Sequence, residues 1–280
     1  MLHLGTDEAG YGPLLGPLVV AAAVFETGAP RATLADPAVA DSKKLYARGG
    51  RDALARALEP YLGLPPPVSL GAALARLSVR GDPRPGYPWY GDVADPVPRP
   101  RPPPPAFRGL FVSPICERDF NEGCAREGGK GALLSRETLR LVRRALLDLP
   151  AGPVRVVCDR HGGRKRYAAL LMEELCPSLV AAERETAEVS AYRLRAQGRD
   201  VAIEFRCRAE AADPPVALAS VAAKYVRELF MQALNEYFAA RVAGLRPTAG
   251  YHGDGERFLA EVEPVLRRVA GSPRALARMR

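Results

Sequence analysis

Hydrophobic positions along this chain recur with two periods, one typical of strands and one typical of helices. Short apolar or alternating runs predict strands at Leu2–Thr6, Leu18–Phe25, Val154–Cys158, Ser178–Ala182 and Val201–Cys207. Apolar residues three and four positions apart predict helices at Arg51–Leu62, Arg136–Leu149, Arg164–Leu175, Val216–Val242 and Glu256–Val269. Because strands and helices alternate along the chain, the fold class that we predict is α/β.

The regular pattern is lost between Gly63 and Gly109, where prolines are dense. The run "DPRPGYPWYGDVADPVPRPRPPPPAF" at 82–107 is too rich in proline for a helix or a central strand. We therefore expect one domain over residues 1–280, with an extended surface insertion at about 63–109, a short helix in it at Leu70–Leu77, and a C-terminal helical part at about 216–280. The simplest interpretation of the insertion is a disordered spacer. Its aromatic residues could instead stack on single-stranded nucleic acid, pack on the domain or bind a proline-recognition module; they are Tyr87, Trp89 and Tyr90.

The composition is that of a soluble globular protein that could bind a polyanion. The 280 residues are 48% hydrophobic and 26% charged, and no apolar run reaches the roughly 20 residues of a membrane-spanning helix. No basic leader precedes a hydrophobic run at the N-terminus, so we expect a cytoplasmic protein, and we expect it to be a monomer. The net charge of +8 favours nucleic acid as a partner, although an arginine-rich composition alone would produce the same charge.

Cysteine and histidine usage excludes two common kinds of site. The five cysteines include no CxxC pair, and there are only three histidines, so neither a disulfide framework nor a zinc site is expected. A metal site with oxygen ligands stays open.

Three acidic residues lie where a strand is expected to end. Asp7 closes "LHLGTD", Asp159 closes "VRVVCD", and Glu210 lies just past the strand that ends in "EFRC". Glu8 adds a carboxylate beside Asp7. Sites form at such strand ends in open α/β sheets, and clustered carboxylates suit a divalent cation such as Mg²⁺. The alternative is that these residues are ordinary surface acids at the starts of loops.

Other polar residues have the types and spacing of a phosphate site. "ADSKKL" places Lys43 and Lys44 beside an aspartate, and Ser220 and Lys224 lie four residues apart on one face of the long helix. An ordinary solvated surface would contain the same pairs. The C-terminal "SPRALARMR" is expected to be a frayed basic end.

Taken in order, these segments resemble the type 2 ribonuclease H superfamily. The likeness rests on "DEAGYGPLLGPLVVAAAV", "DSKKL", "VCD", "RAEAADPPVALASVAAKYVRE" and "GYHGDGERFL", and it covers about residues 1–50 and 110–262. It implies a ribonuclease H-like mixed sheet flanked by helices. It also implies a two-metal endonuclease that uses Mg²⁺ or Mn²⁺ to hydrolyse the RNA strand of RNA/DNA hybrids, leaving 5′-phosphate and 3′-hydroxyl ends.

The resemblance assigns roles to individual positions. By position, the catalytic acids and metal ligands would be Asp7, Glu8, Asp159 and Glu210. Substrate contacts would come from the glycine-rich loop, from residues that hold phosphates and from a tyrosine that packs on a sugar, namely Gly10, Tyr11, Gly12, Lys43, Lys44, Ser220, Lys224 and Tyr251.

Two positions depart from the family pattern. Tyr11 stands where an arginine is expected between two glycines, which leaves cleavage at single ribonucleotides open. The fourth acid is Glu210 rather than the aspartate usual for type 2, and Asp213 is the alternative ligand. A nuclease for another structured nucleic acid and a non-catalytic nucleic-acid-binding protein therefore remain the other functions considered.

Overall fold

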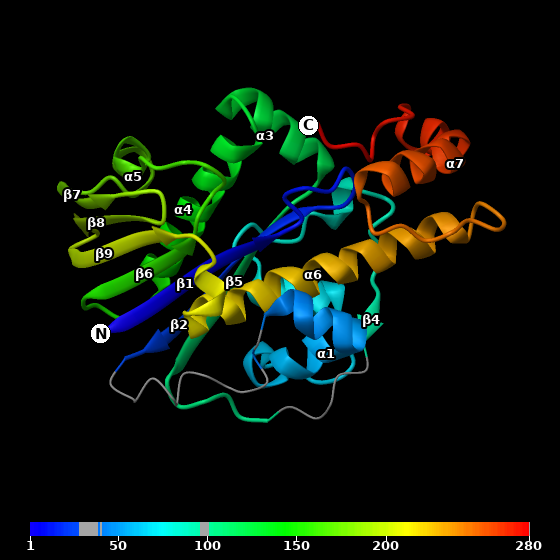
Figure 1. Ribbon diagram of the computed structural model, residues 1–280. Helices are drawn as coiled ribbons and strands as arrows, with labels where there is room; N and C mark the ends of the chain where they lie inside the picture. Colours follow the sequence, from blue (N-terminus) through cyan, green and yellow to red (C-terminus); the bar gives the residue numbers. More distant parts are fainter. Residues whose placement is uncertain (28–38, 40, 96–100, 280) are drawn as a thin grey trace.

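A seven-stranded mixed sheet forms the centre of the computed structural model, which describes residues 1–27, 39, 41–95 and 101–279 (Figure 1). The strands are β1 (Leu2–Ala9), β2 (Leu18–Glu26), β5 (Phe107–Ile115), β6 (Val154–Asp159), β7 (Leu179–Glu185), β8 (Val189–Ala196) and β9 (Arg199–Arg206). Their order across the sheet is β5-β2-β1-β6-β9-β8-β7. β1, β6 and β9 run parallel, and the remaining neighbours are antiparallel. The α/β prediction is confirmed.

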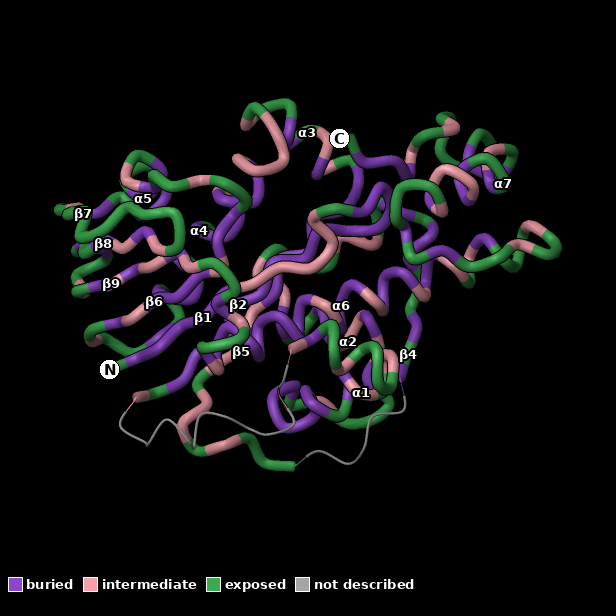
Figure 2. Tube along the Cα trace, viewed as in Figure 1, coloured by how far each residue is buried: buried purple, intermediate pink, exposed green. Residues whose placement is uncertain are grey.

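Helices cover both faces of this sheet. One apolar cluster joins it to α3 (Glu117–Glu127), α4 (Lys130–Asp148) and α5 (Ala168–Leu175). The other joins it to α1 (Ser42–Leu62), α2 (Leu70–Leu77), α6 (Pro214–Ala239) and α7 (His252–Ala270). β2 alternates between the clusters, because Leu18 and Val20 face one and Val19 and Ala21 the other. Much of the central sheet and of α6 is therefore buried in Figure 2.

Two strands of the seven-stranded sheet and one helix were not predicted. β5 contains Gly109 and Pro114, which interrupt its apolar pattern, and β8 carries exposed arginines at Arg193 and Arg195. α3 is largely polar and buries only a few residues, among them Phe120. Each of these elements is stabilised mainly by its neighbours in space, so local periodicity did not mark it.

The proline-rich segment is exposed at 65–67 and 101–103, but its aromatic residues are buried in the domain. Tyr87, Trp89 and Tyr90 are each 3% exposed and belong to the cluster around α6, where the ring of Tyr90 meets that of Phe230 edge-on at 4.8 Å. The short helix predicted at Leu70–Leu77 is confirmed as α2. A small pairing of β3 (Val68–Ser69) with β4 (Ala94–Asp95) and a 3-10 turn at Arg84–Gly86 complete the part that the structure describes. The spacer and nucleic-acid-stacking interpretations are wrong there because packing buries the rings; residues 96–100 lie outside the described residues.

The C-terminal segment is also ordered, contrary to the prediction of a frayed end. Leu276 is fully buried, and the backbone N–H of Arg278 donates to the carbonyl of Leu14 at 2.9 Å. The side chain of Asn121 in α3 bonds the backbone on both sides, donating to Ala277 at 2.9 Å and accepting from Met279 at 2.7 Å. These bonds tie the chain end to α3 and to the start of the chain.

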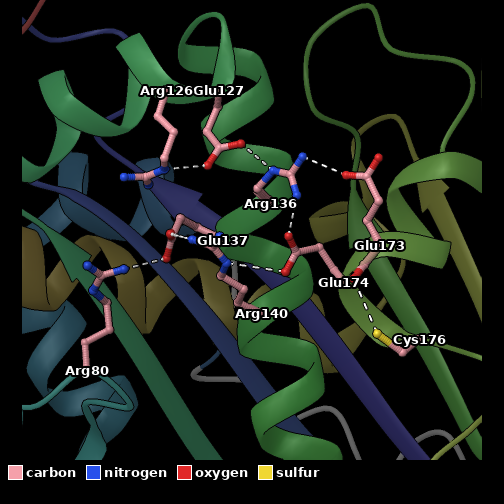
Figure 3. Close-up of polar contacts among 9 residues, drawn as sticks. All are labelled: Arg80, Arg126, Glu127, Arg136, Glu137, Arg140, Glu173, Glu174 and Cys176. Carbon is pink, nitrogen blue, oxygen red and sulfur yellow. Dashed lines mark hydrogen bonds and ion pairs between the residues drawn. The ribbon is translucent and has the colours of Figure 1, made fainter.

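Buried carboxylates join the helices on the α4 face (Figure 3). Arg136 of α4 contacts Glu127 of α3 at 2.5 Å and Glu174 of α5 at 2.6 Å. Arg140 also reaches Glu174, at 3.3 Å. Removal of one arginine would leave buried carboxylates uncompensated, so loss of Arg136 is expected to destabilise this helix layer. No helix among the described residues combines the length and the apolar character needed to cross a membrane.

Candidate active site

The candidate site begins where β1 extends beyond its parallel neighbour β6. Pairing of β1 with β6 ends at Thr6 and Cys158, whereas pairing with β2 continues as far as Ala9. The predicted strand end at Thr6 is therefore wrong, and Asp7 and Glu8 lie inside the strand. Because β6 stops, one edge of β1 is open beside these two acids.

Asp159 and Glu210 reach the same edge from the next two strands. Asp159 is the last residue of β6, and Glu210 lies in a 3-10 turn, Ala209–Ala211, shortly after β9. The backbone N–H of Ala209 donates to Oδ1 of Asp159 at 2.9 Å, which ties this turn to the end of β6. Since β6 and β9 are parallel, their last residues meet at one edge of the sheet.

One cleft of about 270 Å³ contains the four predicted acids. It is also lined by Gly10, Tyr11, Gly12, Lys43, Ser220, Lys224 and Tyr251. Lys44 is the exception: its side chain is 72% exposed, lies 3.9 Å from Asp41 and does not line the cleft. The reason is geometric, since adjacent residues of a helix point in different directions.

Glu210, and not Asp213, lies in the cleft. Asp213 caps the N-terminus of α6, where its side chain accepts from the N–H of Val216 at 3.3 Å. Its other oxygen lies 2.9 Å from Nε2 of His3, and the residue is only 6% exposed. These contacts hold Asp213 away from the other acids.

The cleft concentrates negative charge. The pKa of Asp7 is raised to about 7, chiefly by desolvation and also by the charges of Asp159 and Glu210, while a hydrogen bond with Ser220 opposes the shift. Desolvation likewise raises the pKa of Glu8, with the charges of Asp7 and Asp159 adding to it. The pKa of Asp159 rises to about 6, again chiefly through desolvation, although the N–H of Ala209 opposes the shift. Ionising all of these carboxylates together therefore requires a compensating cation.

The chemistry of the donor set fits a divalent cation. Carboxylate oxygens are the ligands that Mg²⁺ and Mn²⁺ prefer, and mutually raised pKa values are what unneutralised carboxylates produce. In the part of the chain that the structure describes, no three His, Cys, Asp or Glu side chains already enclose a metal position. The acids line one cleft without closing on one point, so a metal would have to draw them together.

The first turn of α1 contributes one cationic residue. The side chain of Asp41 caps this helix by accepting from the N–H of Lys43 at 2.9 Å, and Lys43 lines the cleft. Oγ of Ser42 lies 3.0 Å from Oγ of Ser220, which joins α1 to α6 at the cleft. The helix prediction covered only 51–62; a break at Gly49 and Gly50 hides the continuity of this earlier turn.

α6 contributes the second cationic residue. Nζ of Lys224 lies 2.7 Å from Oε1 of Glu228 and 4.4 Å from the centroid of the Tyr46 ring. The hydroxyl of Tyr46 donates to Oε2 of Glu228 at 3.0 Å, so the three side chains form one unit. This unit holds Lys224 at the cleft and offsets part of its charge.

The loop Gly10–Pro13, called the glycine loop below, contains two glycines. The backbone needs glycine at only one of these two positions. Gly10 has φ +88°, and a Cβ there would lie 2.4 Å from the carbonyl oxygen of Pro17. Gly12 is exposed, and a Cβ there would meet nothing within 4 Å. The fold therefore requires glycine at position 10 but not at position 12.

Arg227 and Ser42 line the cleft but were not predicted. Arg227 is 2% exposed and donates to the carbonyls of Leu15 and Ala249, both at 3.2 Å. Its position three residues after Lys224, in a largely apolar helix, was the available signal. The exposed Tyr251 adjoins this region at the start of α7.

Sequence comparison matches the N-terminal quarter of this chain to ribonuclease HII. A model of the ribonuclease HII family matches residues 4–73. A ribonuclease HII of Xanthomonas axonopodis pv. citri (strain 306) is 47% identical over 61 residues, which are 22% of this chain and 23% of that protein. The match to the relative thus spans about a quarter of its length. The segment that the family model matches includes the acid pair and the glycine loop.

Structural comparison extends the likeness to the whole fold. Ribonuclease HII of Archaeoglobus fulgidus, solved in complex with PCNA, has a TM-score of 0.52 at 21% identity, covering 100% of this chain and 95% of that one. Ribonuclease H2 of Pyrococcus horikoshii OT3 has a TM-score of 0.49 at 17% identity, covering 99% and 92%. The predicted resemblance to the type 2 ribonuclease H superfamily and the predicted ribonuclease H-like fold are confirmed.

Proposed function

We propose that this chain is a metal-dependent endoribonuclease that hydrolyses the RNA strand of RNA/DNA hybrids and leaves 5′-phosphate and 3′-hydroxyl ends. The observation that carries this proposal is the convergence of Asp7, Glu8, Asp159 and Glu210 on one cleft. Asp7 and Glu8 lie in the segment that matches the ribonuclease HII family, which supports the same conclusion.

The four acids would hold two Mg²⁺ or Mn²⁺ ions. Such ions, when bound, neutralise charge on a phosphodiester and lower the pKa of a coordinated water. The acids themselves would release their protons on metal binding, because metal ligands must be deprotonated. Asp7, with a pKa of about 7, makes this exchange sensitive to pH near neutrality.

The other walls of the cleft would bind and orient the nucleic acid. Lys43, Ser220 and Lys224 would contact phosphates. Gly12, which the fold does not require to be glycine, would allow the backbone to approach a 2′-hydroxyl. Tyr251, 58% exposed at the cleft, would pack on a sugar.

Tyr11 favours a second candidate function, a nuclease of the same fold that acts on another structured nucleic acid. A tyrosine can stack on a sugar or base, but it does not supply the forked cation expected between the glycines. A non-catalytic nucleic-acid-binding protein is disfavoured, because phosphate binding alone gains nothing from four carboxylates in one cleft.

Three further properties belong to this proposal. We propose one domain over residues 1–280, a monomeric state and a cytoplasmic location. Apolar clusters on both faces of one sheet support the single domain, and the free thiols of all five cysteines support the reducing compartment.

The first experiment compares three duplexes supplied with Mg²⁺ or Mn²⁺: one with a single ribonucleotide, one with four, and a full RNA/DNA hybrid. Cleavage of the hybrid and of the four-ribonucleotide duplex, with 3′-hydroxyl ends, is expected. Tight hybrid binding with no cleavage of any duplex would overturn the proposal. Cleavage of another structured nucleic acid alone would support the second candidate.

The second experiment tests the ligand assignment. Asp7→Asn is expected to abolish cleavage while hybrid affinity stays equal or rises, since a negative charge facing phosphate is removed. Asp148→Asn, which changes a surface aspartate near the end of α4, is the matched control. Equal cleavage by the Asp7 variant and the control would refute the assignment.

A further inference from the structure

A second pocket adjoins the carboxylate cleft. It has a volume of about 290 Å³ and shares Tyr11, Gly12 and Pro13 with the cleft. Its other walls include Lys130, His252 and Arg278, and it is called the loop pocket below. None of these three residues was predicted as a site residue.

Two helices begin at the loop pocket. Lys130 is the first residue of α4 and His252 the first of α7, and each helix is 19 residues long. Neither helix has a side-chain hydrogen bond at its N-cap, so the N–H groups of both first turns lack that partner. Nζ of Lys130 lies 5.1 Å from the centroid of the Tyr11 ring. Helix N-termini and a lysine together favour an anion.

Arg278 supplies independent evidence for an anion here. Its side chain is 3% exposed, and its Nη2 donates to the carbonyls of Gly10 and Pro13 in the glycine loop. Nε and Nη1 are buried without a hydrogen-bond partner, and no ion pair to this residue is found within the described ranges. Burial and the charge of Arg227 lower the pKa of Arg278 to about 10. The guanidinium lies 4.3 Å from the centroid of the Phe120 ring, and the charge of Glu117 opposes the lowering of its pKa, but neither contact supplies a hydrogen bond to Nε or Nη1. A bound anion would accept from these two buried N–H groups.

We propose that the loop pocket binds a backbone phosphate of the nucleic acid, next to the phosphate held at the carboxylate cleft. This inference rests on the proposed function and extends its contacts to a second site. Lys130 and Arg278 place positive charge in the same pocket as Tyr11, the position where the family pattern has an arginine. The shared lining of the two pockets allows one strand to reach both.

The test measures binding without cleavage. Fluorescence anisotropy in EDTA would follow wild-type protein, Lys130→Gln and Arg143→Ala on RNA/DNA hybrids in which one phosphate at a time is a neutral methylphosphonate. Arg143 is the matched control, because it is an exposed cation on the same helix and outside the loop pocket. Thermal melting of each variant shows whether it is folded, and Lys130→Met replaces Lys130→Gln if the latter melts early.

We expect one or two adjacent methylphosphonate positions to weaken wild-type binding about tenfold. Lys130→Gln should lose that sensitivity and reduce the slope of log Kd against log salt by about one. Arg143→Ala should keep the wild-type profile. The proposal is overturned if the Lys130 variant keeps the wild-type profile, or if no position matters in the wild type. Failure of the proposed function would instead appear in the separate cleavage assay with Mg²⁺ or Mn²⁺, as absent cleavage by a protein whose binding profile in EDTA is as expected.

Discussion

The two glycines of the glycine loop are expected to respond differently to replacement by alanine, one in stability and the other in activity. Gly10→Ala should destabilise the fold, and Gly12→Ala should leave the fold intact but impair cleavage of RNA/DNA hybrids. The contrast follows from the structure, since a Cβ at Gly10 would collide with backbone and a Cβ at Gly12 would project into open space.

The magnitudes follow from the same geometry. At Gly10 the left-handed φ of +88° costs alanine about 1–2 kcal/mol. A Cβ only 2.4 Å from the carbonyl oxygen of Pro17 adds about 1–3 kcal/mol of overpacking. The expected loss in the free energy of unfolding is therefore about 2–5 kcal/mol. Gly12→Ala should change it by less than about 0.5 kcal/mol.

Urea unfolding and hybrid cleavage, measured on both variants, test this reasoning. Gly12→Ala should raise KM or lower kcat/KM for the hybrid at wild-type stability, because a methyl group would occupy space next to the ribose. Full cleavage by Gly12→Ala would refute the assignment of this backbone to substrate contact. Equal loss of stability in the two variants would refute the geometric argument itself.

Three more changes test other parts of the structure. Trp89→Ala should lower the free energy of unfolding by about 3–5 kcal/mol and leave hybrid affinity in EDTA unchanged; reduced affinity at full stability would restore the stacking hypothesis. Glu210→Gln should abolish metal-dependent cleavage, whereas Asp213→Ala should keep it and cost about 1–2 kcal/mol through the lost cap; the opposite result would make Asp213 the ligand. Burial raises the pKa of Glu117 from 4.5 to about 7, so its contribution to stability is full below about pH 4.5 and is lost as pH rises through 7. The expected loss in the free energy of unfolding is about 3 kcal/mol, at 1.36 kcal/mol per pKa unit. Urea unfolding between pH 4.5 and 8 should show this loss in the wild type and not in Glu117→Gln. The same pH dependence in both proteins would contradict the assignment to Glu117.

The acids could be found from the sequence because each of them follows a local pattern. Asp7 and Asp159 stand at the end of apolar runs that predict strands, and both runs are strands of the sheet. Ser220 and Lys224 were placed on one helix face by their spacing, and both line the cleft. Patterns of this kind span only a few residues, so they can be recognised without knowledge of the fold.

Contacts between distant segments had no such pattern. The sequence left Glu210 and Asp213 as alternatives, and the contact of Asp213 with His3, 210 residues earlier, separates them. Lys43 and Lys44 looked equivalent until the packing of α1 on α6 turned only Lys43 to the cleft.

The α/β alternation, the order of the acids and their place near strand ends could be predicted from residues close together in the chain, because backbone periodicity and strand-end chemistry are local. The burial of the rings around Trp89 and the contact of Arg278 with the glycine loop depend on the folded arrangement of distant segments. Proline content and basic charge indicate the backbone conformation and the solvation that a segment favours. Its burial depends instead on which apolar surface lies opposite it in the fold. That surface is supplied by residues of α6 and β1–β2, far away in sequence.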